Sequence, residues 1–320
     1  MSAICQTHNA APIAFFTYIR PEHTRLALES LKENHGAESS ELYIYCDGPK
    51  SASENILINQ VREIVKSKKW CGTVHVIERE TNMGLANSVI AGVTDLCEKF
   101  GRVIVIEDDL ILSPYFLDYM NSALDLYQED NQVMQVSGHM FPVKLSCVED
   151  TFFLPFTTSW GWATWNRAWQ YLDSDVKQFA ELASDPKRVN EFNLDGSYPY
   201  FSMLKDQLDG KIDSWAIRWY FSVFIMNGLI LYTKWSLVNN IGFDGSGTHC
   251  NKSKVLRQKF RKKAPNITVP SVVSVCNSSF QHIRKFLSAK SKPVSFSFKN
   301  ILISIKKRCS DKLRSNKLCK

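Results

Sequence analysis

Three consecutive carboxylates, Glu107, Asp108 and Asp109, follow the unbroken β-branched run from Val103 to Ile106. Such a run is typical of a strand buried on both faces of a helix-covered sheet, and ligands bind where such strands end. Adjacent carboxylates repel one another, and a divalent cation relieves the repulsion. Oxygen ligands suit Mg²⁺ or Mn²⁺, which keep coordination positions open for phosphates. The stretch therefore predicts a metal-bridged diphosphate site, with a plain acidic loop between strand and helix as the alternative.

The residues before this stretch alternate between strand and helix patterns. Strands are expected over residues 12–18, 42–46 and 74–77, and helices over 24–34, 53–68 and up to about residue 100, the first capped near His23 or Thr24. Alternation of this kind indicates a mostly parallel, doubly wound sheet. Its strand ends would bring Thr17, Asp47 and the acid triplet to one rim. No GxGxxG follows the first strand and no GxxxxGK[ST] occurs, which disfavours a dinucleotide Rossmann site and a P-loop.

Composition narrows the class of protein. The 320 residues are 44% hydrophobic, enough for one large α/β domain or two smaller ones. The nine cysteines form no CxxC pair, which favours reduced structural thiols in a reducing compartment. We expect no signal peptide at the N-terminus and no membrane span, because the longest nearly apolar run, from Trp219 to Tyr232, is shorter than the roughly 20 residues a span needs. A cytoplasmic protein is therefore expected.

The charge is distributed unevenly along the chain. From Cys250 onward there are 19 Lys and Arg and one acid, a net charge of +18, whereas the preceding 249 residues carry 20 basic and 31 acidic groups, a net charge of −11. Phenylalanines and isoleucines are mixed with the lysines of the tail, including the run from Lys306 to Arg308. This mixture indicates a candidate membrane-association segment at an anionic surface, with a solvated tail as the alternative.

Several segments of the sequence resemble those of a known enzyme family. The strand into Glu107-Asp108-Asp109-Leu110, followed by Ser113-Pro114-Tyr115-Phe116 and a helix, resembles the DXD-type motif of GT-A nucleotide-sugar glycosyltransferases, in the EDDL form of the N-acetylglucosaminyltransferase I group. Val136-Ser137-Gly138 resembles the next strand of that family, and Asp213-Ser214-Trp215 with Arg218 resembles its catalytic segment. The segment from Asn82 to Asn87 resembles family 2 glycosyltransferases.

The resemblance implies a domain organisation. It can be followed from about residue 12 to 250, and it implies a Rossmann-like GT-A domain over residues 1–250 with a mostly parallel central sheet flanked by helices. Residues 10–135 would be the nucleotide-binding half and 136–250 the acceptor and catalytic half. Residues 251–320 would form a basic C-terminal extension.

The same resemblance assigns roles to the residues of the donor site. Asp109 would bind the metal, Mn²⁺ or Mg²⁺, while Asp108 would lie by the ribose or sugar and Glu107 would orient its neighbours. Asp47 would accept a hydrogen bond from the uracil of a UDP-sugar, although a turn aspartate before Gly-Pro explains the same residue. Arg20 would lie near the nucleotide. Thr17 and Asn82 complete the predicted donor contacts.

Residues in the second half supply the remaining candidates. Trp160 and Trp162, either side of Gly161, could stack on a sugar ring or simply fill the core. Asp213 is the candidate general base, or else an N-cap; the family has two adjacent acids where this chain has Asp213-Ser214, which leaves Asp206 and Asp209 as fallbacks. His249, after a glycine-rich loop, is a candidate metal ligand or a structural histidine.

Together with the acid triplet, the resemblance implies a metal-dependent, inverting glycosyltransferase. It would transfer a sugar from a nucleotide-sugar, a UDP-sugar by preference, to a hydroxyl of a glycan or lipid-linked glycan in surface polysaccharide biosynthesis. The enzyme would visit the inner face of a membrane and bind no nucleic acid. Two alternatives stay open: a nucleotidyltransferase acting on sugar phosphates, and a non-catalytic polyanion-binding protein that depends on the basic tail.

Overall fold

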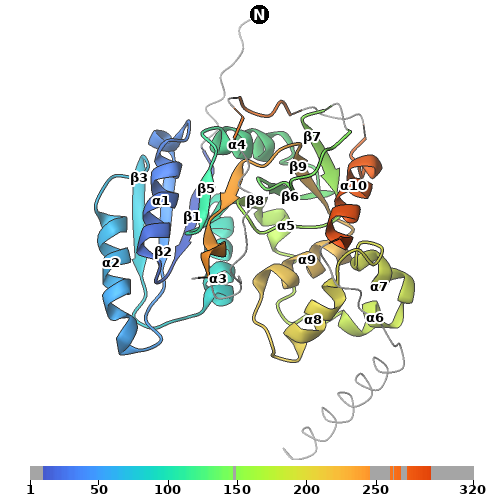
Figure 1. Cartoon of the computed structure of the whole chain (residues 1–320), viewed down its shortest axis with the longest axis horizontal. Coiled ribbons are helices and arrows are strands. Elements are labelled where there is room, and N and C mark those ends of the chain that lie inside the picture. Colours follow the sequence, from blue (N-terminus) through green and yellow to red (C-terminus); the bar gives the residue numbers. More distant parts are fainter. Residues whose placement is uncertain (1–9, 147–148, 246–259, 262, 268–271, 290–320) are drawn as a thin grey trace, which may run out of the picture.

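The β-branched runs of the first hundred residues form the parallel part of one large sheet (Figure 1). The structure is a computed structural model that describes residues 10–146, 149–245, 260–261, 263–267 and 272–289. Its first four strands lie in the order β3-β2-β1-β4 and all run parallel. They are β1 (Ile13–Thr17), β2 (Glu41–Cys46), β3 (Thr73–Glu78) and β4 (Arg102–Glu107).

Helices connect these strands, as the alternation of patterns predicts. They are α1 (Pro21–Lys32), α2 (Asn55–Lys66) and α3 (Leu85–Phe100), with short 3₁₀ turns η1 (Ala37–Ser39) and η2 (Ala52–Glu54). Helix α1 begins earlier than the sequence pattern suggests, because Pro21 occupies its first turn and Arg20 is the N-cap. A proline is well suited to that position, since its fixed φ is already helical and its missing N–H would have no partner there. The predicted cap near His23 or Thr24 is therefore wrong.

The second half of the chain extends the same sheet in the order β8-β6-β9-β7, next to β4. Strands β6 and β9 run parallel to β4, whereas β8 and β7 are antiparallel to their neighbours. These strands are β6 (Val133–Ser137), β7 (Thr151–Leu154), β8 (Trp162–Trp165) and β9 (Leu229–Thr233). Their helices are α4 (Phe116–Leu126), α5 (Asn166–Trp169), α6 (Phe179–Ser184), α7 (Pro186–Phe192), α8 (Tyr200–Leu208) and α9 (Trp215–Ile225). The predicted α/β fold with a mostly parallel sheet flanked by helices is confirmed.

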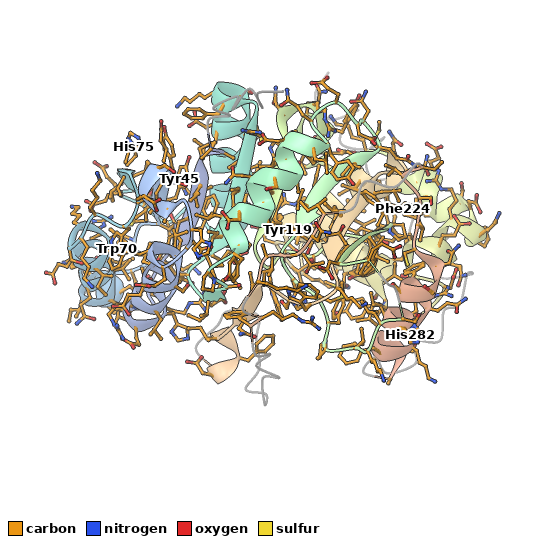
Figure 2. The ribbon with its side chains drawn as sticks, turned by 90° about the horizontal axis from the view of Figure 1, so that it is seen from above. Tyr45, Trp70, His75, Tyr119, Phe224 and His282 are labelled. Atoms are coloured by element: carbon orange, nitrogen blue, oxygen red, sulfur yellow. The ribbon has the colours of Figure 1, made fainter. Side chains whose placement is uncertain are left out.

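Alternate residues of the strands fill two cores, one on each face of the sheet. Ile13 and Phe15 pack toward α1, α2 and α4, whereas Ala14 and Phe16 pack toward α3 and α9. Period-two alternation of this kind is what a strand buried on both faces produces. Figure 2 shows Tyr119, a buried residue of α4, near the middle of the molecule.

A small second sheet lies beside the acid triplet. Strand β5 (Leu110–Leu112) pairs antiparallel with β10 (Val238–Asn240), and the 3₁₀ turn η3 (Gly242–Asp244) follows β10. The sequence pattern did not indicate this pairing, because three-residue strands carry little periodic signal. The pairing brings the segment after Val238 onto the residues that follow β4.

Part of the predicted C-terminal extension belongs to the folded domain. Helix α10 (Asn277–Ser288) buries Ile283 and Leu287 in the core on the α9 side of the sheet, and Val275 forms a bridge with Phe153 of β7. Figure 1 shows α10 beside β7. Residues 290–320 lie outside the described residues. None of the described helices is both long enough and apolar enough to span a bilayer.

Candidate active site at the carboxyl ends of the strands

The predicted rim of polar side chains exists. Phe16 of β1 lies opposite Glu107 of β4, and Thr17 lies opposite Cys46, the residue before Asp47. The backbone continues this register, since the N–H of Asp108 donates to the carbonyl of Phe16 at 3.0 Å and that of Asp47 donates to Thr17 at 3.1 Å. The parallel strands thus bring Thr17, Asp47 and the acid triplet to one edge of the sheet.

Arg20 is paired with both aspartates of the triplet. Its Nη2 forms an ion pair with Oδ1 of Asp108, and its Nη1 lies 3.3 Å from Oδ2 of Asp109. The Asp108 and Asp109 side chains are only 5% and 12% exposed, and that of Arg20 is 18% exposed. Thr17 adds a hydrogen bond from its hydroxyl to Oδ2 of Asp108 at 3.3 Å. Arg20 therefore lies beside the acid pair, while its predicted position near the nucleotide stays a prediction.

Burial and mutual repulsion perturb these acids. Burial raises the pKa of Glu107 to about 8, helped by the charges of Asp109 and Asp108 and opposed by Arg20. The pKa of Asp108 is also raised, because burial outweighs the opposing charge of Arg20. Burial lowers the pKa of Arg20, but the two aspartates more than offset it and the net shift is upward. Asp108 and Asp109 thus share a single guanidinium in a poorly solvated place, while the neighbouring Glu107 is mostly protonated at pH 7.

The segment after β10 covers this group. The N–H of Ile241 donates to the carbonyl of Asp109 at 2.8 Å, and a Cβ on Gly242 would clash with the Asp109 carboxylate. His23 of α1 lies 3.2 Å from Asp244 of η3. Only glycine lets the backbone approach a carboxylate this closely. The described part of this predicted loop therefore lies against Asp109, its closure over a donor stays a prediction, and its end, with His249, lies outside the described residues.

Asp47 holds a loop rather than pointing freely into the site. Its Oδ1 accepts from the N–H groups of Gly48 (3.0 Å) and Met83 (2.9 Å), and its Oδ2 accepts from Gly84 (3.0 Å). Asn82 adds to this loop by donating to the carbonyl of Gly48 at 2.9 Å and accepting from Gly84 at 3.1 Å. The predicted uracil contact of Asp47 and donor contact of Asn82 stay predictions. The contacts that are present fix the turn before α3.

The two tryptophans have different environments. Trp162 is fully buried, stacked on Trp215 at 5.1 Å and close to Trp169. This corrects its prediction as a sugar-binding residue, because an indole with no exposed surface is a core residue. Trp160 is half-buried and contacts Phe243 of η3 edge-on, with ring centroids 5.5 Å apart. Trp160 therefore lies next to the cover of the acid pair and remains a candidate wall of the sugar site.

Sequence reasoning missed His139, which lies one residue after the Val136-Ser137-Gly138 match. Its ring is buried against Trp160 at 4.4 Å and Phe141 at 5.1 Å, and Nδ1 lies 3.4 Å from the hydroxyl of Ser236. Burial lowers its pKa to about 3, so the ring is neutral at physiological pH. No pattern in the sequence distinguishes such a histidine, since its role depends on an aromatic neighbour more than 20 residues away.

Asp213 is positioned at the beginning of α9 but is not its cap. Ser214 is the N-cap, and its hydroxyl accepts from the N–H of Ile217. Asp213 instead accepts from Arg218 at 2.6 Å, and its side chain is 59% exposed. The N-cap alternative for Asp213 is therefore wrong, while its catalytic role is untested. The fallback acids, Asp206 and Asp209, both lie near Lys211.

The carboxylate oxygens of the acid pair are suitable ligands for a hard divalent cation. Asp108 and Asp109 offer carboxylate oxygens, and the excess of acids over guanidinium leaves charge that a cation would balance. Among the described residues, no three His, Cys, Asp or Glu side chains are grouped so that they alone could hold a metal ion. A metal here would therefore need oxygen atoms from a bound phosphate or water in addition to Asp109.

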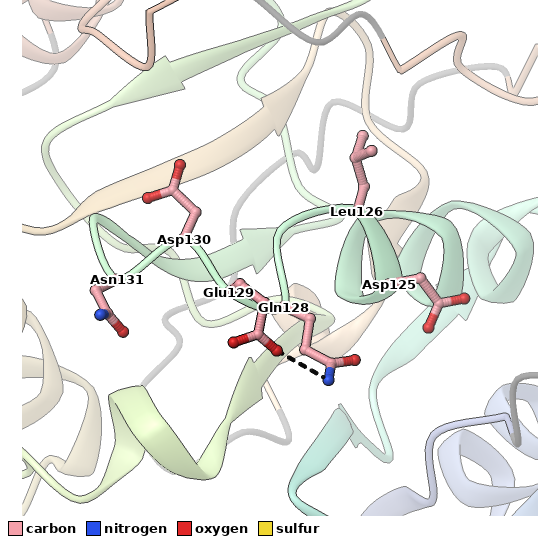
Figure 3. A pocket seen from close by; sticks show the side chains of 6 residues that line it. All are labelled: Asp125, Leu126, Gln128, Glu129, Asp130 and Asn131. Atoms are coloured by element: carbon pink, nitrogen blue, oxygen red, sulfur yellow. Dashed lines mark hydrogen bonds between the residues drawn. The ribbon is translucent and has the colours of Figure 1, made fainter.

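A polar hollow lies away from the acid triplet, at the opposite edge of the sheet. It is lined by Asp125, Leu126 and residues 128–131, at the end of α4 and before β6 (Figure 3). Because β6 runs parallel to β4, the amino end of β6 lies at the edge opposite the acid triplet. Arg167 donates three hydrogen bonds to backbone carbonyls of Tyr127, Gln128 and Val133 and thereby fixes this turn. The hollow adds nothing to the candidate active site.

The acid triplet, the strand that carries it and both tryptophans fall within a family match. Residues 93–177 match the model of the GNT-I family. The resemblance to the N-acetylglucosaminyltransferase I group is thus confirmed over the segment that runs from α3 through β4 to just beyond α5. The GNT-I match supports a glycosyltransferase. No curated protein matches the chain.

Several solved structures resemble the chain at low sequence identity. TarS 1–349 of S. aureus is 13% identical, with a TM-score of 0.41, and the match covers 71% of this chain and 59% of TarS. Mouse xyloside xylosyltransferase 1 is 12% identical, with a TM-score of 0.34 and coverage of 68% and 81%. Glucosyl-3-phosphoglycerate synthase of Mycobacterium tuberculosis, solved with Mn²⁺, UDP and glucosyl-3-phosphoglycerate, is 15% identical, with a TM-score of 0.31 and coverage of 51% and 58%. The chain spans less than two thirds of TarS and of the synthase.

Proposed function

We propose that this protein is a metal-dependent glycosyltransferase that transfers a sugar from a UDP-sugar, with inversion, to a hydroxyl of a glycan or lipid-linked glycan. The observation that carries the proposal is the buried pair Asp108 and Asp109 with Arg20 at the end of β4, inside the segment that matches the GNT-I family. Buried acids in excess of a single guanidinium are costly unless they serve a ligand. A metal-bound diphosphate is the ligand that such a group suits.

The donor would lie along the carboxyl edge of the sheet. Its diphosphate would lie at Asp109 and Arg20, with Asp108 beside the ribose or sugar. Asp109 would hold Mn²⁺ or Mg²⁺, which when bound supplies positive charge to the departing diphosphate. The loop that Asp47 fixes, from Asn82 to Gly84, would form the floor beneath the base. Trp160 and η3 would shield the sugar from water, which limits hydrolysis of the donor.

Transfer also needs a base for the acceptor. We assign this role to Asp213, whose exposed carboxylate at the beginning of α9 is held by Arg218. As the acceptor oxygen attacks the anomeric carbon from the face opposite the diphosphate, its proton would pass to Asp213 while the bond between sugar and diphosphate breaks. The anomeric configuration is inverted and UDP is the leaving group.

The charge distribution supports a proposal for the place of action and, through it, for the acceptor. The basic tail would bring the enzyme to an anionic cytoplasmic membrane face, where a lipid-linked glycan for a surface polysaccharide would be the acceptor. The free thiols of Cys46, Cys71, Cys97 and Cys276 fit a reducing compartment.

A thermal-shift screen tests the donor class. In the presence of Mn²⁺, UDP at 100 times its Kd should add about 2.7 kcal/mol of stability and raise Tm by several degrees. GDP, ADP and CDP should shift Tm less, and EDTA should abolish the effect of UDP. A larger shift with UTP than with UDP, together with pyrophosphate release on adding a sugar 1-phosphate, would instead favour the nucleotidyltransferase alternative.

A further inference from the structure

The guanidinium of Arg20 lies where a cation is needed. It contacts one carboxylate oxygen of Asp108 and one of Asp109 at the same time, so it bridges the two acids that the proposed function gives to a metal-bound donor. A planar guanidinium suits this bridging because its N–H groups diverge in fixed directions. The acid pair is therefore already occupied by a positive charge that belongs to the chain.

The position of Arg20 is built into the fold. Arg20 is the N-cap of α1. Its carbonyl accepts hydrogen bonds from the backbone N–H and from the hydroxyl of Thr24, both at 2.9 Å. The Thr24 hydroxyl also lies 2.6 Å from that of Thr17, which donates to Asp108. Pro21 stiffens the turn that follows. The backbone of Arg20 is thus tied to the strand end that also holds its partner.

The surroundings leave little room for a second cation beside Arg20. Gly242 lies against both Asp109 and the Nη1 atom of Arg20, so closely that a methyl group there would meet the guanidinium at 3.0 Å. All three charged side chains are largely buried, where like charges repel strongly. A divalent ion and the guanidinium would therefore compete for the same carboxylates.

We propose that Arg20 acts as a resident counter-ion that keeps Asp108 and Asp109 closed to a divalent cation until a nucleoside diphosphate arrives. The diphosphate takes the guanidinium as its own partner, because phosphate oxygens accept bidentate hydrogen bonds from arginine. The freed carboxylates are then available to the metal. This inference rests on the proposed function, and it makes the binding of metal and of nucleoside diphosphate strongly cooperative.

Cooperativity of this kind is reciprocal. If UDP raises the affinity for Mn²⁺ by some factor, Mn²⁺ raises the affinity for UDP by the same factor. The coupling arises because Arg20 leaves the carboxylates of Asp108 and Asp109 for the diphosphate. Removal of the guanidinium should therefore strengthen the binding of Mn²⁺ alone, which is the opposite of what the loss of a metal-site residue normally does.

The test is a titration of the full chain with Mn²⁺, in which electron paramagnetic resonance measures free Mn²⁺, with and without UDP. In the wild-type protein, UDP should tighten Mn²⁺ binding at least 100-fold. Arg20→Gln should bind Mn²⁺ alone at least tenfold more tightly than the wild type and should lose most of the UDP effect. Arg25→Gln is the matched control, because Arg25 lies on the same helix and pairs with Glu22 and Glu29 at the surface.

A second variant keeps the test decisive if Arg20→Gln does not fold. Arg20→Lys keeps the positive charge but lacks the rigid planar fork of the guanidinium, so it should give an intermediate UDP effect. Unchanged Mn²⁺ affinity in a folded Arg20→Gln would overturn the inference, and metal-dependent UDP binding by the wild type would then leave the proposed function standing. Equal Mn²⁺ affinity with and without UDP in the wild type would overturn both, because reciprocity then removes the metal dependence of UDP binding. Absence of UDP binding in every variant would overturn both.

Discussion

At the scale of single residues, the two largely buried ionisable groups Arg20 and His139 have opposite properties. Arg20 keeps its charge because Asp108 and Asp109 surround it, whereas His139 loses its charge because aromatic rings surround it. The neutral ring of His139 contacts Trp160, which in turn contacts η3.

His139 makes stability depend on pH. Its pKa is about 3 in the folded protein and about 6.5 in the unfolded chain, so the unfolded state binds more protons as pH falls below 6.5. This histidine alone should lower the free energy of unfolding by about 2 kcal/mol between pH 7 and pH 5. Urea unfolding at both pH values measures the difference.

His139→Gln should remove that part of the pH dependence, while His282→Gln, at an exposed position on α10, should retain it. An identical loss of stability between pH 7 and pH 5 in wild type and His139→Gln would show that the ring is not held neutral.

At the scale of elements, the loop before α3 depends on a single carboxylate. In Asp47→Asn, an amide group takes the place of the oxygen that accepts from the N–H of Gly84, and that N–H is left without an acceptor. The free energy of unfolding should therefore fall by about 1–3 kcal/mol. Hydrogen exchange of the Met83 and Gly84 amides should accelerate together with this loss. Asp95→Asn, at an exposed site on α3, should change stability by less than about 0.5 kcal/mol.

The same variant separates the two interpretations of Asp47. If the residue mainly contacts uracil, UDP affinity should fall while stability and amide protection stay as in the wild type. If Asp47 mainly fixes the loop, the protection of the Met83 and Gly84 amides from exchange should fall, and UDP affinity should fall as well.

The elements also show what the sequence can predict. The strands β1 to β4 and their helices follow from apolar periodicity, and the common rim follows from parallel register. The pairing of β5 with β10 joins residues more than 120 positions apart and has no local signal, so the cover over Asp109 could not be predicted in detail. Trp160 and Trp162 look alike in sequence, yet Trp162 lies in β8 and is a core residue, whereas Trp160 precedes that strand, across Gly161 with its positive φ, and contacts Phe243 of η3.

At the scale of the whole molecule, we propose different tasks for the two oppositely charged parts of the chain. Residues 306–308, which lie outside the described residues, should contribute about 1 kcal/mol each to binding an anionic bilayer. Replacing Lys306, Lys307 and Arg308 by Gln should therefore weaken sedimentation with phosphatidylserine vesicles roughly 100-fold.

The matched control replaces Lys66, Lys68 and Lys69, a basic cluster at the end of α2, by Gln. Vesicle binding should stay close to that of the wild type, as should UDP binding in both triple variants. Equal weakening by the two triple variants would mean that the tail has no special role at the membrane.

The central claim is that Asp109 holds a metal-dependent site for UDP, and isothermal titration tests it most directly. The full chain is titrated with UDP and with GDP, with and without Mn²⁺, and compared with Asp109→Ala and with Asp118→Ala, an exposed acid paired with His35. We predict that UDP binding needs Mn²⁺, exceeds GDP binding, disappears in Asp109→Ala and persists in Asp118→Ala. Failure of folded wild-type protein to bind UDP with Mn²⁺, or full UDP binding by Asp109→Ala, would contradict the account.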